Sequence, residues 1–249
     1  MSIGSTADWD GLREVGRVAR LMLESLTAQV RPGVTTGALD DIAAGLLEAH
    51  GARSAPAAVY GFPGHVLISV NDEIVHGIPG PRRIRAGDVV KIDVTIEKGG
   101  YVADAARSVV VEPGSATAHR LVACARAAFA AALSVARAGV RVNQIGRVVE
   151  REVRRRGFTV VEGLAGHGVG RTIHEEPSVP NRYDAAQRDV LTEGLVLTIE
   201  PMISTGSPRV VQGTDGWTLR TWDGSLSAHH EHTLVITRGA PIVLTGAPA

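Results

Sequence analysis

Gly87-Asp88-Val89-Val90-Lys91-Ile92-Asp93 and Gly194-Leu195-Val196-Leu197-Thr198-Ile199-Glu200 are two copies of one pattern, G-x-V-[VL]-x-I-[DE], separated by 107 residues. Upstream, further matches recur at a separation of 106 residues: Arg31 with Arg137, Gly33-Val34 with Gly139-Val140, and Gly51 with Gly157. The repetition predicts two similar halves, at about residues 9–115 and 116–240, that differ by a one-residue insertion. Duplicated halves usually pack about a pseudo-two-fold axis, so we expect the two copies to occupy equivalent positions around such an axis.

Each copy of the pattern ends on an acid, Asp93 in the first half and Glu200 in the second. Equivalent residues meet near a pseudo-two-fold axis, so these two carboxylates are expected to converge. Acidic side chains that converge in a protein interior must be paired, protonated or bound to metal. The repeat therefore indicates a metal site shared by the two halves. The alternative is that two half-buried strands merely end alike.

The composition is ordinary for a globular protein, with 44% hydrophobic and 21% charged residues in a chain of 249. Lys+Arg and Asp+Glu both number 26, so charge argues against a nucleic-acid or membrane partner. The N-terminus lacks the apolar stretch of a signal peptide. The single cysteine, Cys124, cannot form an intramolecular disulfide, which is consistent with a reducing cytoplasm. We expect a cytoplasmic monomer that forms one domain over residues 1–249.

Apolar residues at spacings of three and four predict two helices in each half. We expect these helices at about Leu12–Leu26, Thr36–His50, Leu121–Val135 and Ile145–Gly157. β-rich sequence follows each pair of helices, at Val66–Val70, Val89–Glu97, Tyr101–Val111, Leu195–Ile203, Thr218–Trp222 and Thr233–Thr237. This order predicts an α+β protein of two αα-plus-antiparallel-sheet halves, whose strands form one continuous sheet with helices on its outer face.

Asp93 and Asp104 lie in two strands joined by Glu97-Lys98-Gly99-Gly100, which predicts a β-hairpin. A loop at Lys98-Gly99 places the two acids directly opposite each other, and a loop at Gly99-Gly100 places them diagonally. Both carboxylates face the same side in either case, because side chains alternate along a strand. Their repulsion favours a pair of divalent cations between them. The alternative is a carboxylate that is solvated at the edge of the sheet.

Three further candidates for metal ligands follow downstream. His167 lies in the glycine-flanked stretch Gly166–Gly170, Glu200 ends the second copy of the repeat, and Glu231 stands at the head of an expected strand up to Thr237. His230 and His232 would point to the opposite face of that strand and are expected to be structural. Four carboxylates and one neutral imidazole carry a charge that balances two divalent ions. Their oxygen-rich donor set favours Co, Mn or Fe(II), with Zn as the alternative.

The longer motifs that contain these residues resemble those of the type I methionine aminopeptidases. The resemblance extends in order from about Trp9 to Thr237. The motifs that carry it are Asn71-Asp72-Glu73-Ile74-Val75-His76-Gly77-Ile78-Pro79, Lys91-Ile92-Asp93-Val94-Thr95, Gly166-His167-Gly168-Val169-Gly170, Thr172-Ile173-His174-Glu175-Glu176-Pro177, Thr198-Ile199-Glu200-Pro201-Met202 and Ser227-Ala228-His229-His230-Glu231-His232-Thr233. The resemblance implies the pita-bread fold, which agrees with the duplicated halves.

The resemblance also implies roles for individual residues. The metal ligands would be Asp93, Asp104, His167, Glu200 and Glu231, with Asp104 and Glu231 bridging the two ions. A hydroxide that bridges two such ions is a nucleophile at neutral pH. Glu200 would also transfer protons in general acid–base catalysis. His76 and His174 would lie on either side of the scissile amide and hydrogen-bond its carbonyl oxygen or its nitrogen.

The residues of the expected substrate pocket depart in part from the family pattern. Phe62 and Trp217 match its aromatic walls, whereas Val59, Leu67 and Ile173 replace tyrosine, cysteine and a bulky residue such as phenylalanine. Aliphatic replacements keep the pocket apolar, so methionine remains the expected side chain.

We therefore expect a metalloaminopeptidase that removes N-terminal methionine when the second residue is small. Its partners would be peptides or nascent chains and, transiently, the ribosome. The alternatives are a proline-directed peptidase of the same fold and a non-catalytic binding protein. Proline-directed members usually carry an extra N-terminal domain, and binding members typically lack metal ligands.

Overall fold

The computed structural model describes residues 1–246, and within them all four predicted helices are present. They are α1 (Thr6–Ala28), α2 (Thr36–His50), α4 (Ala116–Leu133) and α5 (Val142–Arg155). A further short helix, α3 (Ala55–Tyr60), follows α2 in the chain. The N-cap of α2 is Thr35, whose hydroxyl accepts a hydrogen bond from the amide of Ala38 at 3.0 Å. Thr36 begins the helix itself and is buried. No helix in this part of the chain combines the length and apolar composition needed to cross a membrane.

Fourteen short or long strands among residues 1–246 form two sheets. The large sheet of eleven strands has the central order β1-β4-β5-β13-β9-β7-β8, with β2, β6, β10 and β14 attached to it, and the small sheet has the order β11-β12-β3. The strands are β1 (Arg53–Ser54), β2 (Leu67–Val70), β3 (Glu73–Val75), β4 (Val89–Lys98), β5 (Tyr101–Val110), β6 (Thr159–Val160), β7 (Ala165–Gly168), β8 (Glu175–Pro180), β9 (Val196–Ile199), β10 (Met202–Ser204), β11 (Val210–Gln212), β12 (Leu219–Thr221), β13 (Ser227–Val235) and β14 (Ile242–Val243).

The centre of the large sheet is symmetric. β5 of the first half pairs antiparallel with β13 of the second, and β4 and β9 lie outside them. The two copies of the sequence repeat lead into β4 and β9, so they flank the β5–β13 seam from opposite sides. This arrangement agrees with the predicted pseudo-two-fold relation and places the acid of each copy beside the seam.

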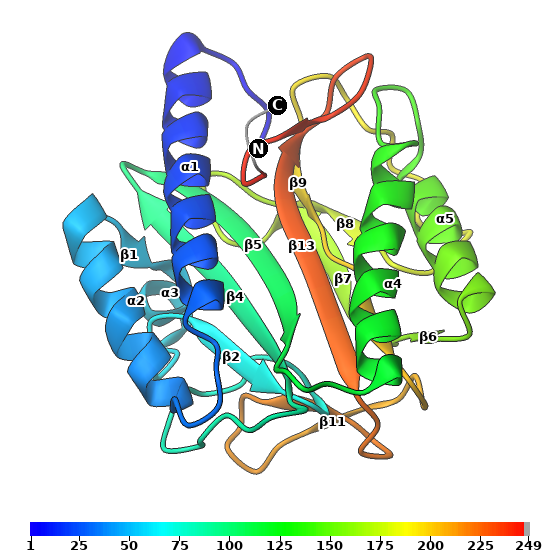
Figure 1. Ribbon diagram of the computed structural model, residues 1–249. Coiled ribbons are helices and arrows are strands. Elements are labelled where there is room, and N and C mark those ends of the chain that lie inside the picture. The colour runs from blue at the N-terminus through cyan, green and yellow to red at the C-terminus, as the bar shows by residue number, and fades with distance from the viewer. Residues whose placement is uncertain (247–249) are drawn as a thin grey trace.

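The four long helices cover one face of the large sheet (Figure 1). α1 and α2 lie over the first half and α4 and α5 over the second. One apolar cluster contains Leu12, Met22 and Leu39 together with β4 and β5 residues, and another contains Leu121 and Val149 with β9 and β13 residues. Burial of these helix stripes against the sheet is the main stabilising contribution and leaves the opposite face of the sheet available for a site.

The hairpin between β4 and β5 has the second of the two predicted loops. Gly99 and Gly100 have positive φ values of 60° and 82°, which glycine adopts without steric cost. Lys98 then pairs with Tyr101, which places Asp104 opposite Thr95 and Asp93 opposite Ala106. The two acids are diagonal neighbours on one face, as that register requires.

Two predicted strand boundaries are wrong in an informative way. The expected strand Leu195–Ile203 is interrupted after Ile199, so that Glu200 lies between β9 and β10. The last central strand begins at Ser227 and not at Glu231, which puts Glu231 in its middle. The polar run before Glu231 does not read as a strand, but every residue of β13 is buried. The boundary between the two halves near residue 115 stays a prediction.

Candidate metal centre and substrate pocket

A cavity of about 170 Å³ lies on the face of the sheet that the helices leave uncovered. His230 and His232 of β13 contact Phe129 of α4 at ring distances of 5.3 and 5.2 Å, so Glu231 between them projects to the opposite face. The cavity spans the β5–β13 seam and contains residues from both halves. Its lining includes eleven of the twelve predicted site residues: Phe62, Leu67, His76, Asp93, Asp104, His167, Ile173, His174, Glu200, Trp217 and Glu231.

Four carboxylates converge in this cavity from four segments. Asp93 comes from β4, Asp104 from β5, Glu231 from β13, and Glu200 from the end of β9. Glu231 is 2% exposed and Asp104 is 5% exposed. Threonines orient two of the acids, because Thr95 Oγ1 donates to Asp104 Oδ1 and Thr198 Oγ1 donates to Glu200 Oε1, both at 2.9 Å.

The four acids are poorly compensated by the protein. Burial, and after it the negative charge of neighbouring acids, raises the pKa of Asp93, Glu200 and Glu231 well above the usual range. Burial also raises the pKa of Asp104. Oδ1 of Asp93 and Oε1 of Glu231 are buried without a hydrogen-bond partner in residues 1–246. A cluster of unpaired carboxylate oxygens of this kind fits divalent cations, which would offset its charge and complete its bonding.

Ligand atoms in the cluster lie close enough to hold metal. Two groups have all their ligand atoms within 4.8 Å of one another, Asp93 with His229 and Glu231, and Asp104 with His167 and Glu231. Glu231 is common to both groups. The residues present therefore fit metal on both sides of this carboxylate.

His167 has the environment of a metal-binding imidazole. Its Nδ1 donates to the carbonyl oxygen of Gly168 at 2.9 Å, and its Nε2 lies 3.4 Å from Glu200 Oε1. The bond at Nδ1 leaves Nε2 as the nitrogen that carries the lone pair. Burial lowers the pKa of His167, which keeps the ring neutral.

His174 packs against His167 with a ring distance of 4.3 Å and also lines the cavity. The hydroxyl of Tyr60 lies 2.7 Å from its Nδ1. This contact fixes the orientation of the imidazole and directs Nε2 away from Tyr60. Burial lowers the pKa of His174, and so does the nearby His167. A neutral, oriented imidazole is suited to hydrogen bonding with a substrate.

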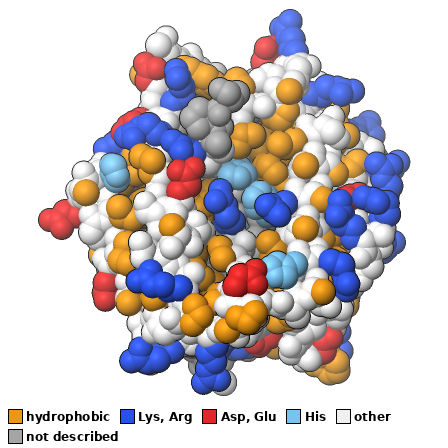
Figure 2. Space-filling view, viewed as in Figure 1, with side chains coloured by type: hydrophobic (Ala, Val, Ile, Leu, Met, Phe, Trp, Pro, Cys, Tyr) orange, Lys and Arg blue, Asp and Glu red, His pale blue; other side chains and the backbone are white. Residues whose placement is uncertain are grey.

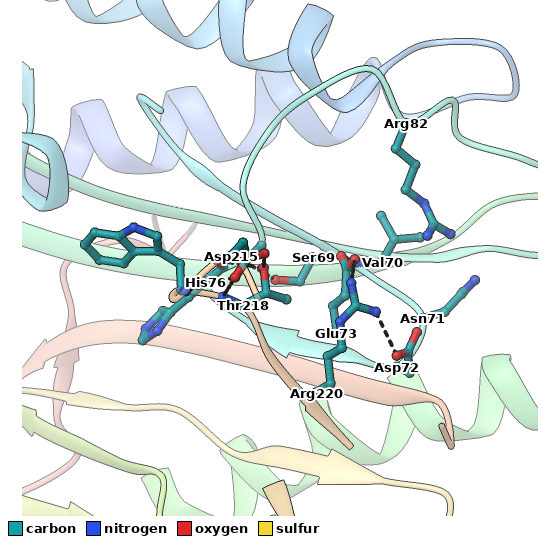
Figure 3. Close-up of polar contacts among 12 residues, drawn as sticks. Ser69, Val70, Asn71, Asp72, Glu73, His76, Arg82, Asp215, Thr218 and Arg220 are labelled. Carbon is teal, nitrogen blue, oxygen red and sulfur yellow. Dashed lines mark hydrogen bonds and ion pairs between the residues drawn. The ribbon is translucent and has the colours of Figure 1, made fainter. Parts of the chain in front are cut away.

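His76 approaches the cavity from the small sheet. Its φ of 60° is unusual for a residue other than glycine and turns the chain sharply after β3. Figure 3 shows the polar contacts that surround this turn: Arg220 bonds both Asp72 and Glu73, at 2.9 and 2.8 Å, and Thr218 bonds Asp215 at 2.6 Å. The bonds of Arg220 link β12 to the start of β3, which holds the turn at His76 in place.

His229 was not among the residues selected from the sequence. It is 1% exposed, and its Nε2 lies 3.3 Å from Glu231 Oε2 and 3.8 Å from Glu200 Oε2. Both ring nitrogens have no hydrogen-bond partner within residues 1–246, and burial lowers the pKa of His229 to about 3. His229 stands two residues before Glu231 and therefore shares its face. If the strand had been predicted to start at Ser227, the alternation of side chains would have placed His229 on the same face as Glu231.

The apolar wall of the cavity differs from the prediction at one position. Phe62 meets Trp217 edge to face at a ring distance of 5.3 Å, and Leu67 and Ile173 complete the wall. Val59 is 59% exposed and does not line the cavity. The helical turn of α3 directs Val59 outward and brings the next residue, Tyr60, to the cavity instead.

Comparison with known proteins identifies the family. The model of metallopeptidase family M24 matches residues 10–238, and the chain belongs to this family. It is similar over nearly its whole length to methionine aminopeptidases. Methionine aminopeptidase 2 of Bacillus subtilis (strain 168) is 44% identical over 247 residues, covering 98% of this chain and 99% of that protein.

Solved structures confirm the pita-bread fold. The methionine aminopeptidase from Rickettsia prowazekii is 33% identical with a TM-score of 0.94, covering 99% of this chain and 100% of that chain. A prolidase from Pyrococcus furiosus is 21% identical with a TM-score of 0.80, covering 99% of this chain but 66% of its own. That likeness extends to the fold alone.

Proposed function

We propose that this protein is a methionine aminopeptidase that removes the N-terminal methionine from peptides or nascent chains whose second residue is small. The observation that carries the proposal is the convergence of four buried carboxylates and His167 beside a small apolar pocket. The likeness to methionine aminopeptidases over nearly the whole chain supports it.

We infer that two divalent cations occupy the centre. Asp93, Asp104, His167, Glu200 and Glu231 would hold them, with Asp104 and Glu231 shared. Four carboxylates offset the charge of two such ions, and the oxygen-rich donor set suits Co, Mn or Fe(II) more than a thiolate site would, with Zn as the alternative. When bound, the ions would supply a nucleophile at neutral pH and polarise the scissile carbonyl.

The protein's own side chains would perform the other steps. Glu200, held by Thr198, is placed to accept a proton from the attacking water and return it to the leaving amine. His174 and His76 reach the cavity from different elements and would hydrogen-bond the oxygen or nitrogen of the scissile amide. These bonds would strengthen as charge develops on the carbonyl oxygen.

The pocket accounts for the choice of side chain. Its volume of about 170 Å³ is below the roughly 300–1,000 Å³ of sites for drug-sized ligands, so it fits one side chain. Phe62, Leu67, Ile173 and Trp217 offer apolar contact, which suits an unbranched thioether. A charged first residue would lose its hydration without a partner there. The second residue would lie at the rim, where crowding favours small side chains.

We further propose that the enzyme acts as a cytoplasmic monomer and meets some substrates at the ribosome. The free, buried Cys124 is consistent with a reducing compartment. Sedimentation of the purified protein, alone and with ribosomes, tests the monomeric state and the association.

Cleavage of Met-Ala-Ser, norleucine-Ala-Ser and Ala-Pro-Ser peptides, with metal content measured on anaerobically purified protein, tests the function. We expect cleavage of the first, somewhat slower cleavage of the second, and two metal ions per chain. Preference for Ala-Pro-Ser would indicate a proline-directed peptidase of this fold. No cleavage with Mn, Fe(II) or Co(II) would indicate a binding protein.

A further inference from the structure

A second polar cavity lies on the helix-covered face of the sheet, behind the candidate metal centre. Its volume is about 530 Å³, and it lies between α4 and the adjoining parts of β5 and β13. Figure 2 shows Lys or Arg and His side chains gathered around the hollow in the middle of this face. The groups that give this cavity its character are Arg107, Arg126, His119, His230 and Glu112.

The two arginines have no counter-ion in the described protein. Arg107 is half-buried on β5, directly across from His230 of β13, and Arg126 projects from α4. Neither guanidinium makes a hydrogen bond or ion pair with any residue of the segment 1–246. The cavity's one carboxylate, Glu112, is paired with His119 at 3.2 Å. Positive charge is therefore in excess at this cavity.

His230 supplies a second and independent observation. It is 92% buried, since its exposed fraction is 8%, and it lines the cavity. Its Nδ1 has no hydrogen-bond partner within residues 1–246. Edge-to-face contacts with Phe129 and His232, at ring distances of 5.3 and 5.1 Å, fix the ring. Nδ1 is enclosed, so Nε2 is the ring nitrogen that stays accessible and can meet a ligand in the cavity.

We propose that this cavity binds a small phosphate-type oxyanion, held by the guanidinium groups of Arg107 and Arg126 and completed by Nε2 of His230. Planar guanidinium groups match the oxygens of phosphate in bidentate fashion. An imidazole N–H can donate a hydrogen bond to an anion. The volume of about 530 Å³ is sufficient for a small oxyanion.

The site is separate from the metal centre. His230 and Glu231 are adjacent on β13, so they face opposite sides of the sheet. An anion bound here needs no metal ion, and its binding does not depend on whether the proposed peptidase activity is correct.

Titration of the metal-loaded protein with inorganic phosphate at constant ionic strength tests the proposal. Arg107→Gln/Arg126→Gln is compared with Arg120→Gln/Arg188→Gln, which removes the same charge from exposed arginines elsewhere. Phosphate bound at the metal centre contributes equally to all proteins, so the difference between the variants isolates the new site. We expect phosphate to raise the Tm of the wild type and of the control, and to raise that of the Arg107/Arg126 variant markedly less.

The ring resonances of His230 in the wild-type protein provide a second measurement. We expect phosphate to shift them with the same midpoint as the rise in Tm. An equal rise in all three proteins, or unmoved His230 resonances, would overturn the proposal. Binding of an RNA oligonucleotide without any response to phosphate would also overturn it, and would indicate a polyanion surface.

Discussion

Lys91 and Thr198 occupy the same position in the two copies of the sequence repeat, two residues before the acid, yet they do different things. Thr198 donates its hydroxyl to Glu200 at 2.9 Å and accepts the amide of His167 at 3.1 Å. Lys91 is 1% exposed, and its Nζ donates to the carbonyl oxygen of Asn71 at 2.7 Å and to Ser227 Oγ at 3.1 Å. The threonine orients the site, whereas the lysine ties the two halves together.

The same contrast extends over the halves as a whole. Each half contributes two carboxylates, but the second half supplies His167, His174 and His229, while the first supplies His76 alone. The apolar wall is shared, with Phe62 and Leu67 from the first half and Ile173 and Trp217 from the second. Duplication thus preserved the strand geometry that places acids at the seam, and the surrounding chemistry diverged between the halves.

Removal of a single bridging carboxylate should have the largest effect on activity. The loss of activity should be the same whether the carboxylate comes from the first half or from the second. We expect Asp104→Ala and Glu231→Ala each to lower activity by several orders of magnitude, because both acids are proposed to bridge the ions. The folded structure should persist, since each change removes one of four crowded, buried carboxylates. Peptide assays with saturating metal measure this, with Glu193→Ala at an exposed position as the control. If either variant kept more than about a tenth of wild-type activity, the shared centre would be wrong.

The histidines of the second half should separate ligation from catalysis. We expect His174→Ala to lower kcat by about a hundredfold or more while leaving metal content unchanged, because its proposed partner is the substrate. His167→Ala should reduce metal occupancy as well as kcat. Metal analysis and kinetics on both variants distinguish the two effects. Loss of metal in His174→Ala but not in His167→Ala would mean that His174 is the metal ligand and His167 the residue that contacts the substrate.

Substitution at the shared repeat position should separate the two halves. We expect Thr198→Val to lower kcat by about tenfold through loss of the bonds to Glu200 and His167, and to lower the free energy of unfolding by about 1–3 kcal/mol because the His167 amide loses its acceptor. Lys91→Met should leave kcat near that of the wild type and keep or raise the free energy of unfolding. Burial lowers the pKa of Lys91 to about 7, so the native state disfavours its charge. In Lys91→Met, the carbonyl oxygen of Asn71 would still accept a hydrogen bond from the backbone amide of Ser227, which lies 3.0 Å away, so this oxygen would not lose its last partner.

Urea unfolding and steady-state kinetics on both variants measure these effects. A loss of activity in Lys91→Met comparable to that in Thr198→Val would remove the contrast between the halves.

The smallest expected effect concerns the contact by which the first half orients a histidine of the second. Tyr60→Phe removes the hydroxyl that lies 2.7 Å from His174 Nδ1. A net hydrogen bond of about 0.5–1.5 kcal/mol corresponds to a fall in kcat of roughly two- to tenfold, with KM nearly unchanged. Tyr183→Phe, at an exposed position, is the matched control. A rise in KM with constant kcat would indicate that Tyr60 contacts the substrate and does not orient His174.

Much of this arrangement could be predicted because it depends on local patterns. The helix stripes, the glycine loop of the hairpin and the period of two along β4 and β5 together predict where Asp93 and Asp104 lie. The choice between the two loop registers could not be made, because both adjacent dipeptides contain a glycine that tolerates positive φ.

The parts that could not be predicted depend on tertiary context. Ser227–His232 is polar and resembles a loop, but burial between the helices and the metal centre makes it a strand, which concealed His229. The rotational phase of a helix as short as α3 does not follow from six residues, so Val59 was expected where Tyr60 lies. The cavity at Arg107 needs the packing of α4, which no motif encodes.

The position of the site at the β5–β13 seam also has a kinetic consequence. The β4–β5 hairpin forms from residues close in sequence, but the ligand set is complete only after β13, more than a hundred residues later, has paired with β5. Such pairing is late and slow to form. Metal ions would therefore stabilise the native state more than the folding transition state, so loading the centre should slow unfolding while leaving the rate of folding nearly unchanged.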